Sequence, residues 1–264
     1  MSHMLATEQL TWEQALEYLP EVNQRATAVL RRLRAATPIP ERPRVVDIGS
    51  AQGNFLVACA RLGCDVVGVE PWQPARETAI EVARRSGVSV TILEGTAESL
   101  PLESASYDIV HANAVIEHVI DARKAFSEAS RVLKPGGVFW FSAASSVCPK
   151  QSEIRGFPAF SWYPDKIKRA IMAWAVTERP DLIGHTSQPA VQWFTPWKAR
   201  AMLHKAGFSK VYDRWDLRLP DEGGRVYALA LRLIRLHDLA KLAADVFVPD
   251  CSYAAIKRSD SSYV

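Results

Sequence analysis

Two glycines and an acid stand at the end of the first buried strand that the sequence predicts. In the stretch VVDIGSAQGNF, Asp47 precedes Gly49, and Gly53 follows four positions later. A glycine-rich turn between a strand and a helix presents backbone N–H groups and the positive end of a helix dipole to a ligand. The dinucleotide-binding spacing requires glycines where this chain has Ala51 and Asn54. The turn is therefore unsuited to a pyrophosphate, whereas Asp47 can accept hydrogen bonds from an ammonium group.

A second set of acceptors follows the next two predicted strands. Glu70 ends the strand at residues 65–70, where a carboxylate can accept hydrogen bonds from both hydroxyls of a ribose. After the third strand, Ala97 and Glu98 are placed to border an adenine ring. A ligand with an amino-acid group, a ribose and an adenine, and without phosphate, matches this set of acceptors. S-adenosylmethionine (SAM) is such a ligand, so we predict it as the cofactor.

Histidines are the candidates for the base that methyl transfer to an alcohol or phenol requires. His118 lies just past the fourth predicted strand, at the edge where the reacting methyl group is expected, and His185 lies in a loop before a later helix. We predict both as catalytic, against the alternatives that His118 shapes the cofactor pocket and that His185 is bound to backbone. His111, at the end of its strand, is either a further base candidate or a satisfied core histidine, and His204 is interpreted as structural. No carboxylate cluster has the spacing of a metal site, so no metal is predicted.

Strands and helices alternate through the first half of the chain, which predicts a parallel sheet covered by helices on both faces. The predicted strands occupy residues 44–48, 65–70, 88–93, 107–111 and 138–142, and the predicted helices occupy residues 11–36, 53–62, 73–86 and 121–133. Ligands bind such sheets beyond the carboxyl ends of the strands. We therefore expect the turn at residues 49–53 and Glu70 at one binding edge.

The second half of the chain is less regular. Residues 151–188 are rich in aromatics and prolines, and we interpret them as an inserted cap with a helix at 165–177. Further helices are predicted at 195–206 and 224–247, and further strands at 209–217 and 252–257. The predicted organisation is an N-terminal helical segment (1–40), a SAM-binding core (41–145) and, within the same domain, an acceptor cap with the return helix, the long C-terminal helix and the last strands (146–264).

The run from residue 44 to residue 142 resembles a class I SAM-dependent methyltransferase of the small-molecule type, the group of the ubiquinone and sugar O-methyltransferases. Five pieces carry the resemblance in order: Asp47/Gly49/Gly53, Glu70, residues 95–101, Asp108 with residues 117–119, and residues 133–137. Two positions depart from the family pattern, since Ala51 replaces a glycine and Thr96 stands where an acid is common. The resemblance implies an α/β, Rossmann-like fold, with a mostly parallel seven-stranded sheet, helices on both faces and a helical cap.

The resemblance also implies which residues contact the cofactor. They are Asp47, Gly49, Ser50, Ala51, Gly53, Glu70, Pro71, Trp72, Thr96, Ala97, Glu98, Asn113 and His118. Trp72 either stacks on the adenine or ribose or packs on the surface of its own helix. Ala51 is compatible with close approach of a ligand if its φ is negative.

The predicted function is SAM-dependent transfer of a methyl group to a small molecule, at a hydroxyl oxygen of a sugar, natural product or quinone-like ring. The alternatives are an RNA or protein methyltransferase and a non-catalytic, SAM-binding regulatory subunit. The net charge of +3 and the short basic runs do not indicate nucleic acid as a partner. The sequence has no apolar run of about 18 residues, no apolar signal core and no paired cysteine motif, which predicts a cytoplasmic protein without stable membrane insertion.

The helical pattern at residues 224–247 is apolar on nearly all sides. A helix of this kind is usually buried, so we expect it to form a lid or a homodimer interface. Peripheral contact with a membrane surface is the alternative. The mixed charges among its leucines weaken that alternative.

Overall fold

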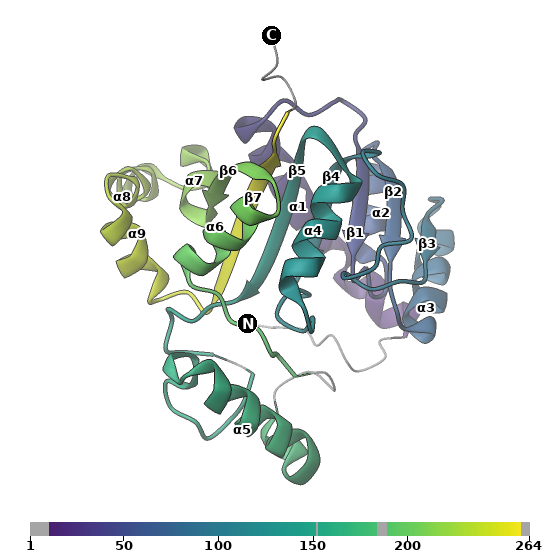
Figure 1. The fold of residues 1–264 in the computed structure, drawn as a ribbon. Coiled ribbons are helices and arrows are strands. Elements are labelled where there is room, and N and C mark those ends of the chain that lie inside the picture. The colour runs from purple at the N-terminus through teal and green to yellow at the C-terminus, as the bar shows by residue number, and fades with distance from the viewer. Residues whose placement is uncertain (1–10, 152, 184–188, 260–264) are drawn as a thin grey trace.

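The computed structural model describes residues 11–151, 153–183 and 189–259. In this part of the chain, seven strands form one sheet in the order β3-β2-β1-β4-β5-β7-β6 (Figure 1). β7 is antiparallel to β5 and β6, and the other neighbouring strands are parallel. The predicted Rossmann-like fold class is confirmed. The strands are β1 (Arg44–Ile48), β2 (Asp65–Val69), β3 (Thr91–Leu93), β4 (Tyr107–Asn113), β5 (Leu133–Ala144), β6 (Phe208–Asp213) and β7 (Asp250–Lys257).

Helices cover both faces of this sheet. Leu30 of α1 and Leu56 of α2 share one core cluster with Val45 of β1, and α3 packs against α1 and α2. Phe126 of α4 and Leu203 of α6 belong to the cluster on the other face. The helices are α1 (Trp12–Ala36), α2 (Asn54–Arg61), α3 (Gln73–Arg85), α4 (Ala122–Val132), α5 (Asp165–Glu178), α6 (Pro196–Lys205), α7 (Arg214–Leu217), α8 (Arg225–Arg235) and α9 (Asp238–Asp245). None of the described helices is both long and apolar enough to cross a membrane.

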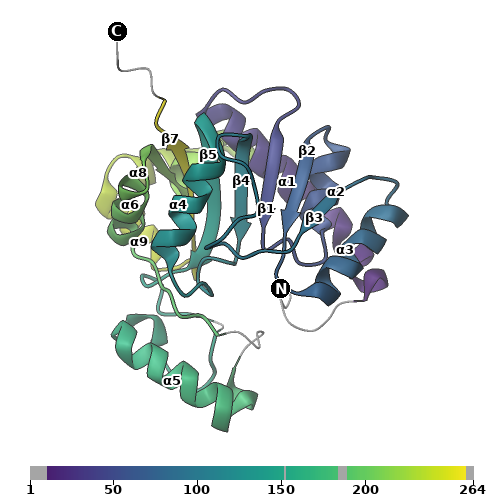
Figure 2. The same ribbon diagram turned by 45° about the vertical axis from the view of Figure 1, so that its right-hand side comes forward.

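The segment between β5 and α6 forms a cap beyond the carboxyl ends of the parallel strands (Figure 2). α5 is its main helix, close to the bounds that the sequence predicts. Phe160, Met172 and Trp193 belong to a hydrophobic cluster of the cap itself. Because the cap has its own core, it can stand over the sheet edge without being part of the sheet.

The strand predicted at residues 209–217 is wrong in its second half. β6 ends at Asp213, and the next four residues form α7. The carboxylate of Asp213 accepts hydrogen bonds from the backbone N–H groups of Trp215 and Asp216, each at 3.0 Å. The backbone N–H of Asp213 donates in return to Oδ2 of Asp216 at 3.2 Å, which completes a capping box and starts a helix where the alternating pattern predicted more strand.

The single helix predicted at residues 224–247 is also wrong. α8 ends at Arg235, and α9 begins at Asp238. Between them His237 has an extended backbone, and its imidazole accepts a hydrogen bond from the N–H of Leu239. His237 is therefore the N-cap of a new helix, and α8 and α9 are two consecutive helices instead of one continuous helix.

Candidate functional site

The turn after β1 packs tightly against two other elements. Gly49 has a φ of +65°, and a Cβ at this position would lie 2.5 Å from Cγ2 of Val115. Gly53 has a φ of +76°, and a Cβ there would lie 2.8 Å from Cβ of Ala79. Both positions combine a left-handed backbone with a close approach, which only glycine tolerates. The turn is therefore held against the segment after β4 and against α3.

Ala51 does not have the negative φ that would suit a non-glycine residue in this turn. Its φ is +45°, in the left-handed region, which costs an alanine about 1 kcal/mol relative to glycine. Its backbone N–H donates to Oε2 of Glu70 at 3.0 Å. That hydrogen bond helps to hold the left-handed backbone, because it ties the turn to the end of β2.

Glu70 is a buried carboxylate that joins the turn to the start of α3. Besides the bond from Ala51, its Oε1 accepts the backbone N–H of Trp72 at 3.0 Å. Burial raises the pKa of Glu70, and the hydrogen bonds from Trp72 and Ala51 act in the opposite direction. Each carboxylate oxygen has a second lone pair. Glu70 can therefore organise the turn and still accept hydrogen bonds from ligand hydroxyls.

Asp47, the acid at the end of β1, has a partner inside the protein. Its Oδ1 lies 2.6 Å from Nδ1 of His111 on β4, and both side chains are buried. The imidazole is stacked between the rings of Phe55 and Trp140, with centroid distances of 3.6 and 4.7 Å. Of the two roles that the sequence leaves open for His111, the structure supports that of a core histidine. The contact of Asp47 with a ligand ammonium stays a prediction.

The variant Asp47→Ala should lower the free energy of unfolding by about 2 kcal/mol, because it removes a charged acceptor from a buried imidazole. Chemical denaturation measures this loss. Asp65→Ala is the matched control, since Asp65 forms an exposed ion pair with Arg44, which typically contributes less than about 1 kcal/mol. Equal losses in the two variants would contradict a stabilising role for the buried pair.

The predicted cofactor contacts after β3 differ in solvent exposure. Ala97 is buried and Thr96 is exposed. Oε1 of Glu98 accepts the backbone N–H groups of Ile120 at 2.9 Å and Asp121 at 3.4 Å. Glu98 therefore supports the turn that follows β4, and its predicted contact with adenine stays a prediction.

Asn113 and His118 lie at the same edge of the sheet, because β4 is the neighbour of β1. Asn113 is the last residue of β4, and its Oδ1 accepts the hydroxyl of Ser142 at 2.8 Å. His118 is half-buried in the turn after β4, and its backbone N–H donates to the carbonyl of Val115 at 2.9 Å. His185 lies outside the described residues, so its catalytic role stays a prediction.

The remaining predicted contacts differ in exposure. Ser50 is buried, and among the described residues its Oγ has no hydrogen-bond partner. Pro71 is exposed, and Trp72 has 44% of its surface exposed at the start of α3. That exposure leaves the indole of Trp72 accessible to a ligand and is equally compatible with a surface role.

Glu117 is a buried acid that the sequence reasoning missed. Its carboxyl group is enclosed beneath the cap, and burial raises its pKa from 4.5 to about 8, with Glu153 and Asp250 adding repulsion. Oε2 has no hydrogen-bond partner among the described residues. Its backbone carbonyl accepts the N–H groups of Val191 and Gln192, at 2.7 and 3.0 Å. Glu117 therefore ties the cap to the turn that carries His118. Glu117 is part of the Glu-His-Val motif at residues 117–119, in which only His118 was predicted to have a role.

Comparisons with known proteins agree with this arrangement. Residues 46–141 match a family model described as a methyltransferase domain. The ubiquinone biosynthesis O-methyltransferase of Agrobacterium fabrum is 29% identical over 192 residues, which cover 71% of each chain. The protein of the same name from Chelativorans sp. is 40% identical over 111 residues, which cover 40% of this chain and 42% of that protein. The chain thus spans less than half the length of the second relative.

Solved structures share the fold at low sequence identity. A SAM-dependent methyltransferase from Mesorhizobium loti has a TM-score of 0.55 and 19% identity, with 87% of this chain and 98% of that chain covered. Phosphoethanolamine N-methyltransferase 2 of Haemonchus contortus, in complex with SAM, has a TM-score of 0.56 and 19% identity, with 89% and 53% covered. At these identities the likeness concerns the fold alone.

Proposed function

Because the chain belongs to the class I SAM-dependent methyltransferases, we propose that it transfers the methyl group of SAM to a hydroxyl oxygen of a small-molecule acceptor. The observation that carries the proposal is the turn at residues 49–53, which Glu70 holds at the carboxyl edge of the sheet. The proposed acceptor is a sugar, a natural product or a quinone-like ring. The printed names of the Agrobacterium and Chelativorans relatives support oxygen as the methylated atom.

The residues at this edge fit SAM. Gly49 and Gly53 have no side chain at the two points where the turn packs closely, and the buried Oγ of Ser50 is available for a hydrogen bond. The carboxylate of Glu70 suits the two hydroxyls of a ribose, and the glycine spacing of the turn does not suit a pyrophosphate. When bound, SAM supplies an electrophilic methyl group on a sulfonium. The protein then has to align the acceptor oxygen with that methyl group and remove the hydroxyl proton.

We assign proton removal to His118 and coverage of the acceptor to the cap. His118 follows β4 at the same edge as the turn, and an imidazole nitrogen can accept the hydroxyl proton. The neighbouring carbonyl of Glu117 binds the cap segment through Val191 and Gln192. The cap is thereby anchored next to the proposed base, where it can exclude water from the acceptor.

The variant Glu70→Ala should weaken SAM binding by about 2 kcal/mol, or roughly thirtyfold in Kd, because hydrogen bonds to a charged group are lost. Isothermal titration with SAM measures the change. Glu94→Ala is the matched control, since Glu94 follows β3 nearby and its exposed carboxylate pairs with Arg76. If Glu70→Ala binds SAM as tightly as the control does, the ribose is placed wrongly.

A further inference from the structure

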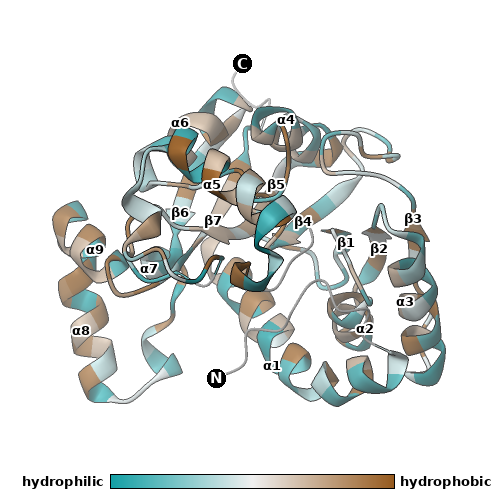
Figure 3. Cartoon of the chain, turned by 90° about the horizontal axis from the view of Figure 1, so that it is seen from below, coloured by the Kyte–Doolittle hydropathy of each residue, from teal (hydrophilic) through white to brown (hydrophobic). Residues whose placement is uncertain are grey.

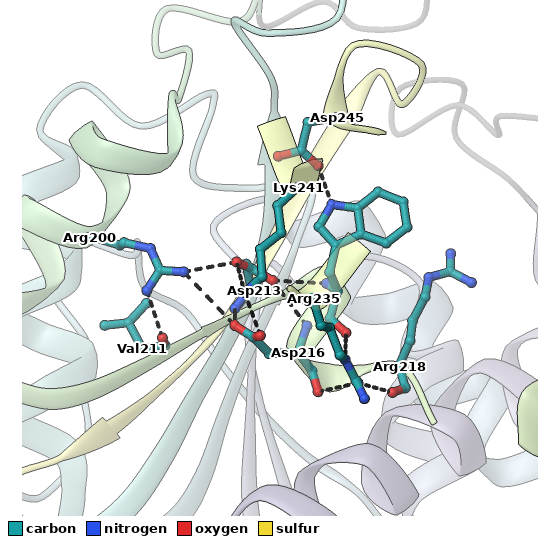
Figure 4. A network of polar contacts seen from close by, with 9 residues as sticks. Arg200, Val211, Asp213, Asp216, Arg218, Arg235, Lys241 and Asp245 are labelled. Carbon is teal, nitrogen blue, oxygen red and sulfur yellow. Dashed lines mark hydrogen bonds and ion pairs between the residues drawn. The ribbon is translucent and has the colours of Figure 1, made fainter. Parts of the chain in front are cut away.

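Arg235 of α8 and Lys241 and Asp245 of α9 turn toward the protein (Figure 4). Arg235 of α8 donates hydrogen bonds to the backbone carbonyls of Trp215, Asp216 and Arg218. Lys241 of α9 pairs with the carboxylates of Asp216 and, at 3.1 Å, Asp213. These contacts fix both helices on α7 and the end of β6, through polar groups.

The opposite side of the helix pair is apolar. Its side chains have between 55% and 85% of their surface exposed. In Figure 3, α8 and α9 lie at one side of the molecule, with hydrophobic bands along both helices. α8 also buries Leu231 against the protein, so the exposed outer side chains form a second apolar face. We call the following residues the α8–α9 outer face: Val226, Leu229, Leu233, Leu236, Leu239 and Phe247.

Positive charge borders the α8–α9 outer face. Arg225 and Arg232 are exposed on the same side of α8 as Leu229, since they lie four residues before it and three after it. Neither arginine forms an ion pair within the described residues. The nearby acids Asp221 and Glu222 are already paired with arginines of α1. Asp238 is an exposed acid on this side, in the first turn of α9, where the helix dipole offsets its charge.

Two exposed tryptophans lie across a cavity from α9. A cavity of about 530 Å³ separates α9 from the cap, and its lining includes Leu242 and Val246 of α9. Trp162 and Trp197 line the same cavity, and each has more than half of its surface exposed. Tryptophan is enriched where a protein meets the interface between lipid and water.

We propose that the α8–α9 outer face docks on an anionic lipid surface. An amphipathic helix lies in such an interface with its leucines in the acyl boundary and its arginines at the phosphates. Three of the five charges that weakened this alternative in the sequence point inward in the structure, those of Arg235, Lys241 and Asp245. The other two, Arg232 and Asp238, are exposed. A second copy of the chain is a poorer partner, because an isologous contact sets a positive surface against itself. The proposal is independent of the methyl acceptor.

Sedimentation of the full chain with vesicles tests the proposal. We expect binding to vesicles of equimolar phosphatidylcholine and phosphatidylglycerol and much weaker binding to phosphatidylcholine alone. Leu229→Asp should lower the partition coefficient roughly tenfold or more, because a leucine no longer enters the acyl boundary. Arg225→Gln and Arg232→Gln should each lower it about fivefold, with the effect vanishing at high salt. Ile80→Asp, at an exposed position of α3, is the matched control and should bind like wild type.

Thermal unfolding and SAM titration establish that each variant is folded. Three results would overturn the proposal. The first is wild-type binding that is absent or equal for the two vesicle types. The second is a folded Leu229→Asp variant that binds like Ile80→Asp. The third is a wild-type dimer in light scattering that Leu229→Asp converts to a monomer while vesicles bind neither protein, which would assign the face to a second copy.

Discussion

The variant His118→Ala is expected to bind SAM as tightly as the wild-type chain and to lose methyl transfer by about 10²- to 10⁴-fold, the usual contribution of a general base. The imidazole lies in the turn after β4, beside the turn after β1 and next to the cap anchor at Glu117. Its removal leaves the cofactor contacts in place but leaves no acceptor for the hydroxyl proton. Incubation with labelled SAM and a host metabolite extract measures transfer, and isothermal titration measures binding.

His204→Ala is the control for this result. His204 lies on α6, where its Nδ1 is 3.0 Å from the carbonyl oxygen of Phe208, so it should retain full activity. Wild-type transfer by His118→Ala would remove His118 from the mechanism. A parallel loss of SAM affinity and transfer would assign His118 to the cofactor pocket instead.

The variant Glu117→Gln is expected to be more stable than the wild-type chain by about 3 kcal/mol at about pH 7. The pKa of Glu117 rises in the folded chain to about 8 because the carboxyl group is buried. Between its ordinary pKa and that value, the folded chain keeps a proton that the unfolded chain releases. The contribution of Glu117 to stability therefore falls as pH rises from about 4.5 to 8 and stays constant above this range. Glutamine is neutral in both states and removes that dependence.

Urea denaturation of the wild type and the variant, repeated across this pH range, measures the difference between them. It should be small near pH 5 and grow with pH. Glu128→Gln is a control of opposite sign, because the hydrogen bond from Arg131 lowers the pKa of Glu128, so this variant should be less stable at neutral pH. An identical pH dependence for the wild type and Glu117→Gln would contradict the buried, protonated state of Glu117.

The elements that build the cofactor edge were predictable because local patterns determine them. β1 has the bounds that its run of buried residues predicts, and the glycines at 49 and 53 mark the turn that follows. The mostly parallel seven-stranded sheet follows from the family resemblance. The errors at Asp213 and His237 also have a local cause, since a side-chain cap outweighed the hydrophobic periodicity in each case.

The chemistry of individual side chains was less predictable, because it depends on residues distant in sequence. Asp47 meets His111 only when β1 and β4 pair. Glu117 is buried where the cap segment at residues 191–192, distant in sequence, binds its backbone carbonyl. The inward turn of Arg235 and Lys241 depends on carbonyls and carboxylates of β6 and α7. The hydrophobic periodicity of residues 224–247 predicted apolar side chains on nearly all sides of a helix. It did not predict which side faces the protein.

Titration of the full chain with SAM, and with NAD as the pyrophosphate-containing comparison, tests the central claim most directly. The turn held by Glu70 predicts saturable binding of one SAM per chain, weakened roughly thirtyfold in Glu70→Ala, and no binding of NAD. An absence of heat at millimolar SAM, with the chain folded, would contradict the claim.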